Sequence, residues 1–488
     1  MTEISRRSLL SAGVGLAASL AMKSAPASDL TSLTLKQASD ALRSKTASSV
    51  DLTQACLARI EKFDHAVNSF ITVTKDQALE AARAAEAEQK RGKWRGPLHG
   101  IPVAVKDNMD TAGIRTTGAS ELFKDRIPTE DCEVVRRLKS AGAVILGKLN
   151  MHEFAYGGTS SVTFFGPVHN PWALDHIPGG SSGGSAAAIA SDFCYGTLGT
   201  DTAGSVRIPA SLCGVVGLKP TYGRVSIRGV IPLSVSLDHV GPLTKTVEDA
   251  ALMLSVIAGY DDADPTTVDV PVPDYVKGME ARTAKLRLGV PRSRFFKNVN
   301  PEVVQAVDAA IEVLRKMTAG VTDVTLPPSE NPARIWDAEI YAYHAKWIKE
   351  TPQLYQPQTR AAILRSGMET AEAYADAHWN MELQRRQIKK AFADIDLLIT
   401  PTMPNVAGLI VPPAGARGGG ASSQNTQPFD VWGLPTISVP CGFSQSGLPI
   451  GLQITGAPFN ESAVLALAHA YEQATEWHKR RPELEKKA

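Results

Sequence analysis

Short apolar segments of strand length alternate with helical patterns along most of this chain, and this alternation constrains the fold more than any other feature. Seven segments have the length and apolar character of buried strands: 101–105, 144–146, 286–290, 321–326, 397–400, 437–439 and 450–454. Several of them are separated by helical patterns, at 131–142, 246–258, 301–317 and 461–476. Such alternation is typical of an α/β fold. We therefore predict a central mixed, mostly parallel β-sheet covered by helices on both faces.

The segment before the first predicted strand, residues 33–92, is helical in character. Leu52, Ala55, Cys56, Ile60 and Phe63 fall on one face of a helix with a period of 3.6 residues. The stretch 78–87 is rich in Ala and Glu, which suits a solvated surface helix.

The composition is that of an ordinary globular protein. Of the 488 residues, 43% are apolar and 21% are charged, and 51 Lys and Arg against 50 Asp and Glu give a formal net charge of +1. A disordered chain would contain fewer apolar residues. A general nucleic-acid-binding protein would need a marked basic excess to neutralise phosphates. We therefore expect no nucleic-acid partner.

The cysteines indicate neither a disulfide framework nor a metal site. They are five in number and widely spaced: Cys56, Cys132, Cys194, Cys213 and Cys441. No pair has the Cys-x-x-Cys spacing, and no Cys/His cluster is present in the sequence. We expect buried, unpaired thiols that pack as small apolar groups, and neither a metal nor a cofactor.

The N-terminus reads as a twin-arginine-type signal peptide over residues 1–27. Arg6 and Arg7 precede an uncharged run from Leu9 to Met22, which an Ala-Pro-Ala cleavage site ending at Ala27 follows. The run is too short to cross a bilayer, which takes about 20 residues. Cleavage would remove three basic residues and one acidic residue, so that the net charge becomes −1. We expect a soluble periplasmic protein with no membrane span in the mature chain.

Residues that could take part in binding or catalysis are most concentrated in two Gly/Ser-rich segments at the centre of the chain, 178–185 and 199–207. Small residues and hydroxyl groups suit a backbone that turns sharply or approaches a ligand closely. The first segment opens a helix at 186–190, whose N-terminal amides could bind an anion. However, neither segment has the spacing of a phosphate-binding loop. An activated hydroxyl is the other interpretation, and it needs a base.

Lys106 is the candidate base at this stage. It ends the apolar run 101–105, where burial would disfavour the ammonium form and lower the pKa from about 10.4. Histidines lie near the motifs, but none is in a recognisable triad context, and no Gly-x-Ser-x-Gly elbow surrounds either candidate serine.

Together with these residues, further motifs in the same order resemble the amidase signature family of Ser/cis-Ser/Lys hydrolases. The matching segments are 100–108, 147–155, the two Gly/Ser-rich segments, 213–221, 396–402, 433–440 and 448–454. The resemblance implies one large amidase domain over 28–488. Its expected parts are a helical N-terminal part at 33–92, a catalytic core at 95–260 and a variable substrate-pocket region at 330–430.

The resemblance also implies the roles of individual residues. Ser205 corresponds to the nucleophile, Ser181 to the bridging serine after a cis peptide bond, and Lys106 to the base. The oxyanion hole would consist of the backbone amides of Thr202, Ala203, Gly204 and Ser205. Many family members have Gly where this chain has Ala203, so the loop must avoid a left-handed conformation there.

The substrate is expected to be a small-molecule amide, cleaved by a monomer or a homodimer. The region 330–400 is rich in aromatic residues: Trp336, Tyr341, Tyr343, Trp347, Tyr355, Tyr374 and Trp379. This richness favours a bulky aryl, alkyl or peptide amide. We predict Trp336 and Tyr343 as pocket residues, together with Tyr156 and Trp432, which adjoin family motifs.

Two alternatives remain open at this stage. The family includes the glutaminase subunit of a tRNA-dependent amidotransferase, in which Asp-Ile-Phe-Thr would stand where this chain has Ser423-Gln424-Asn425-Thr426. The missing Asp, the predicted leader and the neutral charge disfavour that function. An esterase with the same three residues is the second alternative, because an acyl-enzyme forms from amides and esters alike.

Overall fold

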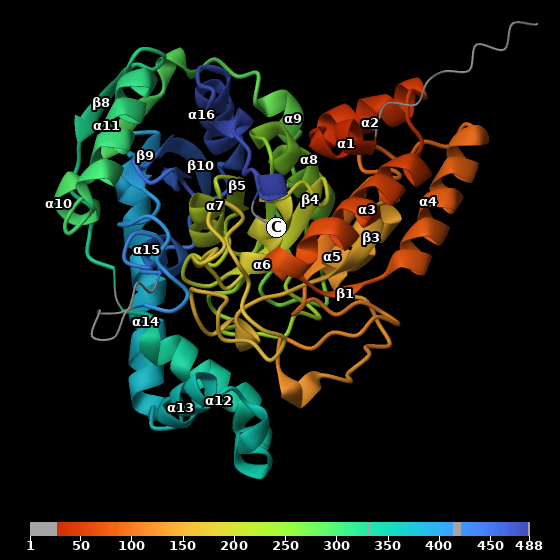
Figure 1. Cartoon of the computed structure of the whole chain (residues 1–488). Helices are drawn as coiled ribbons and strands as arrows, with labels where there is room; N and C mark the ends of the chain where they lie inside the picture. Colours follow the sequence, from red (N-terminus) through yellow and green to blue (C-terminus); the bar gives the residue numbers. More distant parts are fainter. Residues whose placement is uncertain (1–26, 330, 413–420, 487–488) are drawn as a thin grey trace, which may run out of the picture.

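Eleven strands form one continuous mixed sheet in the computed structural model, which describes residues 27–329, 331–412 and 421–486 (Figure 1). The strands are β1 (Phe70–Val73), β2 (Pro102–Lys106), β3 (Val144–Leu149), β4 (Gly196–Asp201), β5 (Val216–Lys219), β6 (His239–Thr244), β7 (Arg287–Val290), β8 (Gly320–Asp323), β9 (Leu397–Pro401), β10 (Thr436–Phe443) and β11 (Pro449–Gly456). Their spatial order is β1-β3-β2-β4-β6-β5-β10-β11-β9-β7-β8. The predicted α/β class and mixed sheet are confirmed.

The predicted predominance of parallel pairing is wrong. Four strand pairs are parallel: β2 with β3 and β4, and β7 with β8 and β9. The other six pairs are antiparallel. The seven predicted strands are all present, but β1, β4, β5 and β6 were missed, and each of these four takes part in antiparallel pairing. In β4 and β6, glycine or proline interrupts the apolar pattern that marks a strand.

Sixteen α-helices accompany the sheet in the described part of the chain. They are α1 (Ala27–Ser32), α2 (Leu35–Ser44), α3 (Ser49–Val67), α4 (Lys75–Lys90), α5 (Glu133–Ser140), α6 (Gly183–Ala190), α7 (Arg207–Cys213), α8 (Val247–Ile257), α9 (Tyr275–Gly278), α10 (Arg292–Phe295), α11 (Pro301–Arg315), α12 (Ala333–Glu350), α13 (Pro357–Ser366), α14 (Ala371–Gln387), α15 (Gln427–Val431) and α16 (Glu461–Gln473). The predicted helices correspond to α2–α4, α5, α6, α8, α11 and α16. Helices α6 and α8 both pack on β4 and β6, on opposite faces of the sheet.

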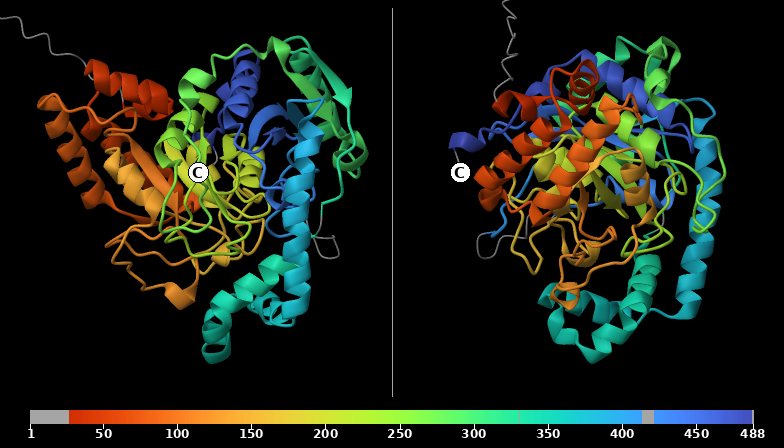
Figure 2. Two further views of the ribbon diagram at one scale, coloured as in Figure 1. Left: turned by 180° about the vertical axis from the view of Figure 1, so that it is seen from behind. Right: turned by 90° about the vertical axis from the view of Figure 1, so that its right-hand side faces the viewer.

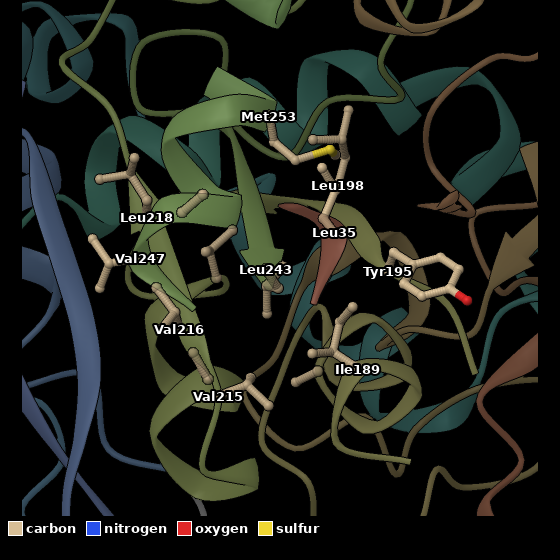
Figure 3. Close-up of a cluster of buried hydrophobic side chains, with 14 of the residues drawn as sticks. Leu35, Ile189, Tyr195, Leu198, Val215, Val216, Leu218, Leu243, Val247 and Met253 are labelled. Atoms are coloured by element: carbon tan, nitrogen blue, oxygen red, sulfur yellow. The ribbon is translucent and has the colours of Figure 1, made fainter. Parts of the chain in front are cut away.

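The core beneath the central strands joins the N-terminal helices to the sheet (Figure 3). Leu198 of β4, Leu243 of β6 and Leu218 of β5 belong with Ile189 of α6 and Met253 of α8 to one cluster of buried side chains. At roughly 25 cal/mol per Å² of apolar surface, burial of each such side chain contributes about 2 kcal/mol. This packing fixes the strands whose ends carry the Gly/Ser-rich segments.

Helices α12, α13 and the lower half of α14 project from the body of the protein (Figures 1 and 2). They lie within the region 330–430 that was predicted to vary. Ile340 and Ile348 of α12 pack with Ile363 of α13 against Phe154, so the projection has its own apolar contacts with the catalytic half of the chain.

One sequence prediction falls on residues outside the described ranges. The predicted leader, 1–27, lies almost entirely within residues 1–26. Within the described ranges, no helix is both long enough and apolar enough to cross a membrane.

Gly184 in α6 is expected to tolerate no side chain. A Cβ there would lie 2.3 Å from the Asn150 carbonyl oxygen and 2.6 Å from the Ser69 carbonyl oxygen, and both atoms are backbone. Gly184→Ala should lower the free energy of unfolding by about 1–3 kcal/mol because backbone atoms cannot move aside cheaply. Urea denaturation measures this change. Gly278→Ala, where the Cβ would meet only the Ser462 side chain at 3.3 Å, is the control and should have little effect.

Candidate active site

The carboxyl ends of two neighbouring parallel strands place Lys106 next to Thr200. Lys106 is the last residue of β2, and Thr200 is the penultimate residue of β4, which pairs with β2. The Lys106 Nζ donates hydrogen bonds to Thr200 Oγ1 at 2.7 Å and to Ser181 Oγ at 2.7 Å. All three side chains are buried. The predicted base and bridging serine are therefore in direct contact.

The position of Ser181 is set by a cis peptide bond and by hydrogen bonds to its backbone carbonyl. The Gly180–Ser181 peptide bond is cis, as the resemblance implied. The Ser181 carbonyl accepts hydrogen bonds from the His152 amide at 3.1 Å and the Ser160 hydroxyl at 3.2 Å. Ser182 then joins both Gly/Ser-rich segments: its hydroxyl donates to the Thr200 carbonyl at 3.2 Å, and its amide donates to the Ser205 carbonyl at 3.2 Å.

Burial makes Lys106 a much weaker base than a surface lysine. Desolvation of the ammonium lowers the pKa of Lys106 to about 7, although the carboxylates of Asp238 and Asp201 oppose this shift. At neutral pH a large fraction of this amine is therefore unprotonated and able to accept a proton. The contact with Ser181 Oγ at 2.7 Å is within the range for proton transfer.

The loop that carries Ser205 wraps around the carboxylate of Asp201. This carboxylate accepts the backbone amides of Gly204 at 2.6 Å and Val206 at 3.1 Å, and it is bound by the Arg207 guanidinium at 2.9 Å. Burial opposes ionisation of Asp201, but Arg207 outweighs this effect and holds the pKa of Asp201 below its usual value. The loop therefore has a fixed anion at its centre.

This arrangement corrects one member of the predicted oxyanion hole. The Gly204 amide points to Asp201 and not to a substrate. Gly204 has a φ of +129°, and a Cβ there would lie 2.2 Å from Thr426 Oγ1, so only glycine fits. Ala203 does not have a positive φ, as expected. Within the described ranges, the amides of Thr202, Ala203 and Ser205 have no hydrogen-bond acceptor, which leaves the other three predicted donors able to bind an oxyanion.

Arg207 connects the loop that carries Ser205 to α15 and β11. Its guanidinium also binds Asp430 of α15 at 2.6 Å, the Thr426 carbonyl at 3.0 Å and Gln453 Oε1 of β11 at 3.0 Å. Thr426 returns to the loop by donating its hydroxyl to the Ala203 carbonyl at 2.6 Å. Buried charge of this kind is stable only when it is paired and hydrogen-bonded, as it is here.

A cavity of about 200 Å³ opens beside Ser205. It is lined by Ala155, Tyr156, Gly157, Gly158, Thr202, Ala203, Ser205, Ile208, Leu233, Trp336, Ala421 and Ser423. No Asp, Glu, Lys, Arg or His is among these described residues. The Tyr156 hydroxyl binds Asp337 behind the cavity wall, and burial raises the pKa of Tyr156, so the phenol is neutral. The cavity therefore favours an uncharged group.

Two of the four predicted pocket residues lie elsewhere. Tyr156 and Trp336 line the cavity, but Tyr343 and Trp432 do not. Tyr343 packs against the rings of His344 and Trp347 of α12. Trp432 is 1% exposed and packs on Phe429 in an apolar cluster. Helical spacing and proximity to a motif do not specify the direction in which a side chain points.

Other nucleophiles and metal chemistry have little support in the described residues. All five cysteines are free and buried, and burial raises the pKa of every one of their thiols. Burial lowers the pKa of His152 to about 3, and no histidine side chain hydrogen-bonds Ser181 or Ser205 within these ranges. No group of three or more His, Cys, Asp or Glu side chains that could hold a metal ion occurs there.

Sequence reasoning missed Thr200, Ser182, Asp201 and Arg207 as parts of the site. All four lie inside the two Gly/Ser-rich segments, so the segments themselves were correctly singled out. Their contacts depend on β4, which pairs with β2 and was not predicted as a strand.

Comparisons with known proteins agree with this geometry. A family model described as Amidase matches residues 51–465, which is most of the chain. The chain therefore belongs to the amidase signature family, and it is a hydrolase acting on carbon–nitrogen bonds.

The individual relatives carry different names. A glutamyl-tRNA(Gln) amidotransferase subunit of Moorella thermoacetica is 44% identical over 93% of this chain and 98% of its own length, and further curated relatives at 40–42% carry the same name. A solved structure described as a vestigial complex bearing on the origins of an s-triazine catabolic enzyme is 34% identical, with a TM-score of 0.84, and covers 91% of this chain and 98% of its own. Peptide amidase from Stenotrophomonas maltophilia is 30% identical, with a TM-score of 0.80, and covers 92% and 98%.

The pKa of Lys106 predicts the pH dependence of any reaction that uses it as a base. Because the neutral amine is the active form, kcat/KM should rise as pH increases through about 7 and then level off. A pH–rate profile on any accepted amide measures this limb. Lys106→Ala should reduce the rate at pH 7 by several orders of magnitude and remove the limb. A variant that keeps the limb would show that another group is the base.

Proposed function

We propose that the protein hydrolyses a carboxylic amide through an acyl-enzyme on Ser205, with Ser181 and Lys106 relaying protons. The observation that carries this proposal is the buried contact of 2.7 Å between Lys106 Nζ and Ser181 Oγ. No other buried amine contacts a serine hydroxyl of the two Gly/Ser-rich segments in the described residues.

In the proposed mechanism, neutral Lys106 takes the proton of Ser181, and Ser181 takes that of Ser205. Ser205 Oγ then attacks the carbonyl carbon, and the amides of Thr202, Ala203 and Ser205 bind the oxyanion. The relayed proton returns through Ser181 to the leaving nitrogen, so the carbon–nitrogen bond breaks and an ester on Ser205 remains. Water hydrolyses this ester by the same relay and releases the acid.

The leaving group is proposed to be ammonia, from a primary amide. The curated relatives named as glutamyl-tRNA(Gln) amidotransferase subunits support a glutaminase-type reaction better than the bulky aryl, alkyl or peptide amide that the aromatic residues favoured. The volume of about 200 Å³ is also below the usual range for sites that hold drug-sized ligands.

The acyl half of the amide is proposed to be uncharged. Glutamine carries an amino group and a carboxylate, and buried charges need partners. The described residues that line the cavity offer none: Ser423 presents a hydroxyl where the glutaminase resemblance implied an aspartate, and Trp336 and Tyr156 add apolar surface. Glutamine hydrolysis within an amidotransferase complex is the second candidate, which the curated relatives favour.

A substrate panel with the purified protein separates these functions. Ammonia release should be faster from small uncharged primary amides than from glutamine, and anilides and the matched esters should be slower. Ser205→Ala should abolish every activity, with an unchanged melting temperature as the control for folding. Preference for glutamine, especially in the presence of a co-purifying partner, would support the amidotransferase function instead. Full activity of Ser205→Ala would reject the mechanism.

The location of the protein in the cell is an independent test that bears on both the predicted leader and the function. Export through the twin-arginine route would separate the protein from any tRNA-charging partner, so location and function are linked. In cells that express the full-length chain, fractionation should recover the protein in the periplasm, and Arg6→Lys with Arg7→Lys should retain it in the cytoplasm. Cytoplasmic recovery of the unchanged protein would remove this objection to the amidotransferase function.

A further inference from the structure

The outward face of α14 carries a continuous exposed stripe. Trp379 lies in the middle of this helix and is 69% exposed, and Leu383, four residues later, is 39% exposed. Ala375, four residues earlier, lies on the same face. Residues four apart share one face of a helix, so these three side chains form an apolar row. A large exposed tryptophan within such a row is typical of a binding surface and not of a solvated helix.

The inward face of α14 explains why the row is rigid. Ala377 and Met381 are buried, and they pack in the same apolar cluster as Trp432 and Phe429. The helix therefore cannot rotate to hide Trp379 without exposing these residues. In both views of Figure 2 the helix lies at the edge of the molecule, with the projecting α12 and α13 at one end.

The charges on the stripe are arranged symmetrically about Trp379. Glu372 lies seven residues before Trp379 and Arg386 seven residues after it, which puts each about 10 Å away along the helix axis. Seven residues are close to two full turns, so both charges share the face of the tryptophan. Both are at least partly exposed, and neither forms an ion pair within the described ranges.

We propose that this stripe binds the same stripe of a second copy of the chain, with the two α14 helices antiparallel and Trp379 at the two-fold axis. In that arrangement Glu372 of each copy faces Arg386 of the other, and Ala375 faces Leu383, a small side chain against a large one. Because Glu372 precedes Trp379 and Arg386 follows it at the same spacing, this charge pair is complementary to itself only when the second helix is reversed. This property specifies a second copy rather than an unrelated partner.

One helix pair makes a small interface. It covers less than the roughly 1,600 Å² of a stable protein–protein complex, so the dimer should form reversibly and depend on concentration. The active-site residues of each copy lie away from this face, on the loops around β2 and β4, so both monomer and dimer should be active.

Sedimentation velocity across a dilution series of the full chain tests the proposal. The unchanged protein should shift from dimer to monomer on dilution, and Trp379→Ala should weaken dimerisation about tenfold or more because it removes the central contact. Ile127→Ala, which alters a residue that is 60% exposed in another part of the molecule, is the matched control and should dimerise normally.

Charge reversal tests the antiparallel arrangement itself. Glu372→Arg and Arg386→Glu should each weaken the dimer, because like charges would face each other in both pairs. The double variant Glu372→Arg/Arg386→Glu should restore it, because the pairs are then reversed. Amide hydrolysis by each variant reports that it is folded. A protein that stays monomeric at every concentration, or single variants that the double variant does not rescue, would overturn the proposal.

Discussion

The site depends on the burial of one amine. Lys106 is removed from water at the end of β2 with no carboxylate of the described residues in contact, and desolvation therefore lowers its pKa toward neutrality. Asp201 and Asp238 are close enough to oppose this shift, and a carboxylate in direct contact would keep the amine protonated. Arg207 binds Asp201 through two guanidinium nitrogens, so the Asp201 anion interacts first with a guanidinium that cannot lose its proton. The arginine thereby limits the electrostatic effect of Asp201 on Lys106.

The same ion pairs join the nucleophile loop to the rigid sheet. Asp201 ends β4 and holds the Ser205 loop through its amides, while Arg207 extends the network to α15 and β11. The Thr426 hydroxyl donates a hydrogen bond back to the Ala203 carbonyl in the same loop. Ser423, three residues before Thr426, lines the cavity. The nucleophile, the proposed oxyanion donors and one cavity wall therefore form a single hydrogen-bonded unit. Preorganised donors of this kind stabilise developing charge without rearrangement.

The residues of the family motifs and most of the residues that line the cavity lie at different places in the sequence. The chemistry lies in the segments around Lys106, Ser181 and Ser205, which match the family model together with most of the chain. The cavity wall is built from Tyr156, Trp336 and Ser423, of which Trp336 comes from the projecting helices. High identity to amidotransferase proteins thus coexists with a described cavity wall that holds no charged side chain. Sequence identity over the whole chain therefore indicates which reaction is catalysed more directly than it indicates which acyl group the substrate carries.

The sequence by itself determined the α/β class, seven strands, most of the helices outside 330–400 and the family, because apolar periodicity and motifs are local properties. It also singled out Lys106, Ser181 and Ser205. Only the tertiary structure decided that β4 and β6 pair antiparallel and that the Gly204 amide donates its hydrogen bond to Asp201. It also decided that Trp432 is a core residue while Trp336 lines the cavity. Each of these depends on which segments pack together and where a side chain points. Neither is fixed by the spacing of residues along the chain.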